Sequence, residues 1–132
     1  MITPEVQADK AKKVTQKLIN AYGKDPTKYD AVEQEAMSAI AFGTVAAYFK
    51  KETDNQPGAF GGVMIAILSQ MFLYEVETAT QCFYYFIDCT KKGFHPTLYN
   101  LIHYGIELYF YLDGPTLGDD LRKTIASIQK NM

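Results

Sequence analysis

The chain lacks the charge of a nucleic-acid-binding protein. It has no tryptophan, one arginine (Arg122), and a net charge of only −2 over 132 residues. Nucleic-acid-binding domains are normally strongly basic, and arginine is their usual residue for two-point contacts with phosphates and bases. We therefore expect no nucleic-acid partner. A hydrophobic share of 48% is also too high for a disordered chain, and the length predicts a single domain over residues 1–132.

Cysteines and long apolar runs are scarce as well. Cys82 and Cys89 are seven residues apart, which on one helix separates them by about 10 Å, too far for a disulfide. Residues 55–74 carry no charge, but their longest apolar run, 63–68, is short, and glycine, proline and glutamine interrupt the segment. We expect no membrane span. Met1–Glu5 shows no secretory signal, so we expect a cytoplasmic protein, with leaderless export left open.

The patterns typical of catalysis and metal binding are missing too. His95 and His103 cannot complete a four-ligand zinc site, and the Glu-x-x-His pairs of di-iron bundles do not occur. His103 and Glu107 lie four apart, a spacing that could hold one metal ion but is not a full ligand set. Cys89 stands near a predicted helix end, where the helix dipole disfavours a thiolate. We predict a protein that is not an enzyme and that holds no metal or cofactor.

Helix start and stop signals, by contrast, recur along the whole chain. Proline follows a capping residue at Thr3-Pro4 and Asp25-Pro26, and His95-Pro96 opens a further helix; glycine follows predicted helices at Gly23 and Gly93. These signals predict helices over 4–22, from 26 to about 52, over 59–92 with room for a break near its middle, from 96 to 111 or 112, and from 117 onward. Strand-like alternation is absent. We predict an all-α, compact bundle of about five helices.

Two of these helices are expected at the centre. Residues 36–49 include no charged side chain, and the predicted helix over 59–92 is also mostly apolar. A helix that is apolar on all sides is normally surrounded by other helices. Ala39, Gly43 and Ala47 are spaced by four and leave a shallow groove, which favours the close approach of another helix. The first and last helices have single apolar stripes and are expected at the periphery.

The small net charge conceals an uneven distribution. Residues 1–28 carry a net +3, and residues 29–132 carry −5. The ordinary interpretation is a solvated lysine face that pairs with acidic neighbours, as Lys13 would with Asp9 four residues before it. The alternative is an acidic partner or an anionic surface that docks on the first helix.

The aromatic residues suggest a binding surface. Twelve of the eighteen lie within residues 72–111. The helix that starts at 96 has one apolar stripe for the core and a second that contains Tyr99, Ile106 and Phe110. Tyrosine and phenylalanine are enriched where proteins bind each other, so we predict these three as anchors, with His103 and Glu107 as the polar rim. An aromatic core without any partner is the other interpretation.

This pattern predicts a small all-α protein-protein interaction module: an adaptor, an inhibitor or an assembly factor that self-associates as a homo-oligomer through the aromatic helix face. The alternative is a bundle that binds a small apolar or aromatic ligand. Its candidate site is Glu75, which on a continuous helix would lie among Met71, Cys82 and Phe86. A carboxylate there needs a specific partner, which could be a ligand or a structural hydrogen bond.

Overall fold

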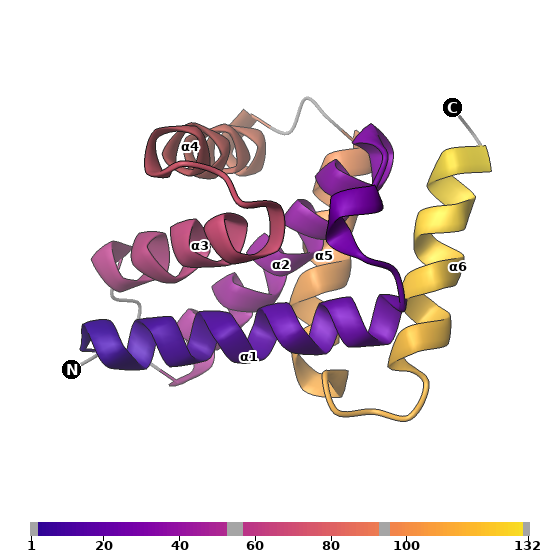
Figure 1. Cartoon of the computed structure of the whole chain (residues 1–132), viewed down its shortest axis with the longest axis horizontal. Helices are drawn as coiled ribbons and strands as arrows, with labels where there is room; N and C mark the ends of the chain where they lie inside the picture. The colour runs from indigo at the N-terminus through magenta and orange to yellow at the C-terminus, as the bar shows by residue number, and fades with distance from the viewer. Residues whose placement is uncertain (1–2, 53–56, 93–95, 131–132) are drawn as a thin grey trace.

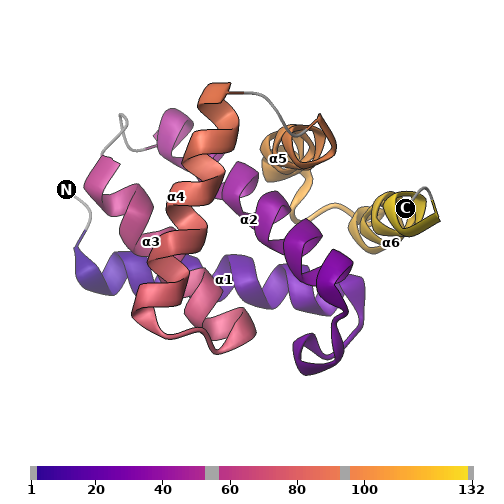
Figure 2. The same ribbon diagram turned by 90° about the horizontal axis from the view of Figure 1, so that it is seen from above.

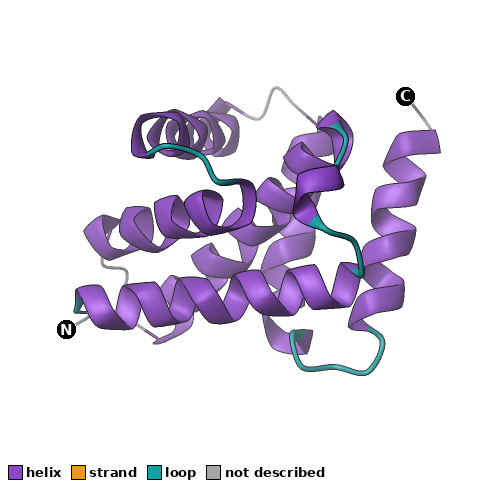
Figure 3. Cartoon of the chain, viewed as in Figure 1, coloured by secondary structure: helices purple, strands orange, loops and turns teal. Residues whose placement is uncertain are grey.

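The computed structural model describes residues 3–52, 57–92 and 96–130, which are almost entirely helical (Figure 1). The elements are α1 (Pro4–Tyr22), a 3-10 turn η1 (Pro26–Lys28), α2 (Ala31–Glu52), α3 (Pro57–Phe72), α4 (Val76–Lys92), α5 (Pro96–Leu108), a second 3-10 turn η2 (Tyr109–Tyr111) and α6 (Leu117–Lys130). No strand occurs within these ranges (Figure 3). The prediction of an all-α bundle is confirmed.

The first helix begins and ends where the sequence predicts. The Thr3 side chain accepts a hydrogen bond from the Val6 backbone N–H at 3.2 Å, and Gly23 ends the helix in the left-handed conformation at φ 78°. The second start signal, Asp25-Pro26, opens only the short turn η1. The long helix α2 begins five residues later, at Ala31.

The predicted helix over 59–92 is two helices. The chain leaves the helical conformation after Phe72 and re-enters it at Val76, so that α3 and α4 are joined by three residues. Leu73 takes a left-handed conformation with φ 57°, which is unusual for a residue with a branched side chain. This break raises the number of α-helices in the described ranges from the predicted five to six.

The helix α2 lies at the centre, with α1, α3, α5 and α6 packed around it. Every residue from 36 to 45 is buried, as the absence of charge over 36–49 predicts. In Figure 1, α1, α3 and α4 form a stack, while α5 and α6 lie toward the other end of the molecule. Figure 2 shows α4 crossing above α2 and α3. The core therefore forms around α2 and α3, the latter through Val63, Met64, Ile67 and Leu68.

The closest helix contact joins α2 and α5. A Cβ atom at Gly43 would lie 1.9 Å from the carbonyl oxygen of Ile102, and one at Gly105 would lie 2.2 Å from that of Ile40. The Thr44 hydroxyl lies within hydrogen-bond distance of the carbonyl oxygens of Ile40, at 2.9 Å, and Gly105, at 3.1 Å. The close approach predicted at Gly43 is confirmed, and its partner is α5.

Among the helices described, none combines the length and apolar character needed to cross a membrane.

Candidate functional site

Four of the five predicted anchor and rim residues lie on one exposed side of α5 and η2. Tyr99 is 37% exposed and Phe110 is 61% exposed, and His103 and Glu107 are exposed as well. We call these four residues the α5 face. The rings of Tyr99 and His103 meet edge to face, with centroids 4.4 Å apart. The fifth residue, Ile106, is only partly exposed because it packs against the core.

The predicted burial of Glu75 is wrong. Glu75 lies in the connection between α3 and α4 and is exposed, and its carbonyl accepts the backbone N–H of Ala79 at 2.9 Å. Three non-helical residues change the rotation of the chain, so that the angular position counted from α3 no longer applies. Met71 and Phe86 belong to the core, and Cys82 is half-buried. The four residues therefore do not form one buried polar site.

Cys82 and Phe86 instead line a surface groove between the first turns of α2 and the helix α4. We call it the α2–α4 groove; its volume is about 340 Å³. Its polar lining comes from Gln34, Glu35 and Ser38 on α2 and from Thr78, Gln81 and Tyr85 on α4. Burial raises the pKa of the Cys82 thiol, which makes it a poor nucleophile.

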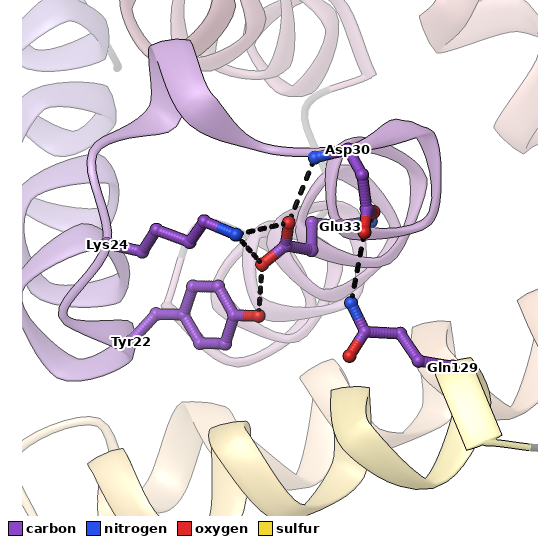
Figure 4. Close-up of polar contacts among 5 residues, drawn as sticks. All are labelled: Tyr22, Lys24, Asp30, Glu33 and Gln129. Carbon is purple, nitrogen blue, oxygen red and sulfur yellow. Dashed lines mark hydrogen bonds and ion pairs between the residues drawn. The ribbon is translucent and has the colours of Figure 1, made fainter.

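A buried carboxylate that the sequence analysis missed lies at the start of α2 (Figure 4). Glu33 is 2% exposed. It accepts hydrogen bonds from the Tyr22 hydroxyl at 2.5 Å, from Lys24 Nζ at 2.8 and 3.0 Å, and from the Asp30 backbone N–H at 2.9 Å. Asp30 accepts in return from the Glu33 backbone N–H at 2.7 Å. The pair forms a capping box, whose D-x-x-E spacing was visible in the sequence.

This network is suited to holding helices together. Gln129 of α6 donates to Asp30 at 3.3 Å, so the cluster joins the end of α1, the start of α2 and the end of α6. Burial raises the pKa of Glu33, but hydrogen bonds from Lys24, Tyr22 and the Asp30 backbone outweigh it, and the pKa lies below its usual value. Burial and the bond to Glu33 raise the pKa of Tyr22. Glu33 thus stays ionised, and both of its carboxylate oxygens accept hydrogen bonds from within the protein. Its role is structural.

Three of the four lysines of α1, namely Lys10, Lys13 and Lys17, are engaged within the molecule. Lys13 pairs with Asp9 at 3.1 Å, and Lys17 pairs with Asp113. The Lys10 ammonium lies over the Tyr48 ring, 4.1 Å from its centroid. The predicted pairing with acidic neighbours is confirmed, and it leaves less of this charge for an external partner.

The described residues offer no group of three or more histidine, cysteine, aspartate or glutamate side chains that could hold a metal ion. His103 and Glu107 are both exposed and belong to the α5 face. Cys82 and Cys89 are free thiols, as their spacing predicts.

A search of curated proteins and a search of solved structures found no match. A family model described as "Immunity protein 48" matches residues 7–132, which is nearly the whole chain. This chain belongs to the immunity protein 48 family.

Proposed function

We propose that this chain inhibits a toxin protein by binding to it. The observation that carries the proposal is the match of residues 7–132 to an immunity protein family. Membership indicates an inhibitor-type role in protein interaction, which agrees with one of the three roles that the sequence suggested. An inhibitor of this kind acts by occupying its partner, and it needs no catalytic residue of its own.

We propose the α5 face as the contact surface. Tyr99 on α5 and Phe110 on the adjoining turn η2 are exposed aromatic side chains, and such residues provide large contact areas with little loss of side-chain freedom. The edge-to-face contact between Tyr99 and His103 restrains both rings before a partner arrives. His103 and Glu107 would form the polar rim, and Ile106 would add only its exposed edge.

The sequence analysis also favoured self-association through this face. A homodimer and a toxin complex would compete for Tyr99 and Phe110, so the two uses can be separated by measuring the mass of the free protein. The small-ligand alternative has less support. Glu75, its expected anchor, is exposed, and the α2–α4 groove is open and partly polar.

The test is co-expression of the chain with toxic proteins from its source organism. We expect growth to be rescued from one toxin, which then co-purifies with the chain. Because alanine at an interface anchor costs more than about 1 kcal/mol, Tyr99→Ala and Phe110→Ala should each weaken the complex at least about fivefold. Tyr84→Ala is the control, since Tyr84 is 63% exposed on α4, outside the α5 face.

Each element of the proposal can fail separately. If the chain suppresses none of the toxins, it is not an inhibitor of this kind. If both alanine variants bind the rescued toxin like the native chain, the contact lies elsewhere. A dimer by light scattering that dissociates in Phe110→Ala, with toxin binding unchanged, would assign the α5 face to self-association.

A further inference from the structure

The α2–α4 groove is rich in hydrogen-bond acceptors and contains no positive charge. Among the described residues, no lysine or arginine lines it. The Ser38 hydroxyl donates to the Gln34 carbonyl at 2.7 Å, so its oxygen offers only lone pairs to an occupant. The side chains of Gln34 and Gln81 each carry an amide oxygen and an amide NH2, so each can accept a hydrogen bond from an occupant or donate one to it. Both helices can therefore offer acceptors to a ligand that carries N–H donors.

Glu35 supplies the one carboxylate of the lining. It is exposed, and none of the ion pairs found in the described ranges includes it. Its charge acts on the groove wall. Burial first raises the pKa of Tyr85, Cys89 adds to the rise, and the Glu35 carboxylate raises it further. Within the lining, Glu35 is therefore the one charged side chain, and its charge is negative.

The aromatic part of the lining suits the same kind of occupant. Tyr74, Tyr85 and Phe86 contribute rings, and the face of an aromatic ring attracts a cation. A volume of about 340 Å³ is at the small end of ligand sites, which fits one long side chain and excludes a folded segment. An anion would be repelled by Glu35, and a purely apolar group would desolvate its carboxylate without compensation.

We propose that the α2–α4 groove receives a lysine or arginine side chain of a partner protein, with the Glu35 carboxylate as its counter-ion. The inference rests on the proposed function for the source of that side chain, but its chemistry comes from the groove itself. The charge of the chain supports it, because residues 29–132 carry −5 while Lys10, Lys13 and Lys17 are occupied by internal contacts.

The test uses the full chain and a minimal probe, followed by amide NMR shifts. Nα-acetyl-arginine amide should shift the amides of residues 34–38 and 78–86 in a saturable way. Nα-acetyl-citrulline amide has nearly the same shape without the charge, and it should bind at least about fivefold more weakly. Glu35→Gln should weaken binding of the arginine probe by a similar factor. The matched control is Glu77→Gln, an exposed carboxylate of α4 outside the lining, which should bind like the native chain.

The proposal is overturned if the arginine probe gives no saturable shifts at the groove, if citrulline binds equally well, or if Glu35→Gln binds like the native chain. Since Glu35 is exposed, its substitution leaves the fold intact, and an unchanged melting temperature verifies this. No toxin enters the experiment. Failure here leaves the inhibitor proposal standing, and failure to find a toxin leaves the groove result standing.

Discussion

Glu33→Gln should destabilise the protein, although it replaces only one oxygen of the buried side chain by an NH2 group. The substitution keeps the shape of the side chain but removes the charge that Lys24 and Tyr22 bind, and it can turn an amide N–H₂ toward one of these donors. A hydrogen bond to a charged group contributes about 1.5–3 kcal/mol, and a buried polar group left unsatisfied costs about 1–3 kcal/mol. Lys24 is partly solvated, so its share is discounted.

We therefore expect the free energy of unfolding to fall by roughly 2–3 kcal/mol, and the melting temperature by roughly 6–10 °C for a chain of this size. Urea unfolding followed by circular dichroism measures the first, and calorimetry the second. Glu35→Gln is the matched control, because Glu35 lies two residues further on and is exposed. A loss at Glu33 no larger than the loss at Glu35 would refute the interpretation of the network as a structural clamp.

The same variant has a defined pH dependence. The pKa of Glu33 in the folded protein lies below its ordinary value of 4.5, so its stabilisation is complete above that value and is lost as the pH falls through the folded pKa. The stability difference between the native chain and Glu33→Gln should therefore be constant near neutral pH and shrink in acid. A double-mutant cycle with Tyr22→Phe should show coupling, because the two side chains share one hydrogen bond.

Two further predictions concern the backbone. Gly43→Ala places a Cβ 1.9 Å from the Ile102 carbonyl oxygen and should lower the free energy of unfolding, measured by urea unfolding, by more than about 3 kcal/mol. Gly61→Ala, whose Cβ would lie 3.4 Å from the Phe83 ring, should leave that free energy unchanged or raise it. Equal effects of the two substitutions would contradict the close contact between α2 and α5. Leu73→Gly should raise the free energy of unfolding by about 0.5–1 kcal/mol, and with it the melting temperature, because a backbone φ of 57° costs leucine more than glycine. Leu73→Ala keeps that cost and should give no comparable gain.

Much of the architecture could be predicted because its signals are local. Thr3-Pro4 and Gly23 act through hydrogen bonds within one turn of the helix end, and Lys13 reaches Asp9 one turn away. The Gly43 contact could be anticipated because only a residue without a side chain allows two backbones to touch. The sequence did not reveal which helix would fill that space, since the choice of α5 depends on the whole packing.

The missed features depend on contacts far along the chain or on unusual residues. The sequence analysis left room for a break in the helix over 59–92 but did not locate it. Glycine or proline would have marked its position, but the left-handed residue is Leu73, which as a leucine favours helix. Glu75 was placed on a continuous helix because the break could not be located. Asp30 and Glu33 had readable capping-box spacing, but the burial of Glu33 depends on Tyr22 and Lys24, which the turn η1 brings back against α2.

The contact between Thr44 and Gly105 spans 61 residues of sequence. A ribosome that adds about 5–20 residues per second takes roughly 3–12 seconds to make that stretch. Throughout this interval the side of α2 that contains Gly43 has been synthesised, whereas α5, which covers it in the folded protein, has not. A newly made chain therefore passes through a stage in which its central helix, buried in the folded protein over residues 36–45, is open to chaperones and to other nascent chains. Yield on overexpression should depend on how fast residues 96–108 follow.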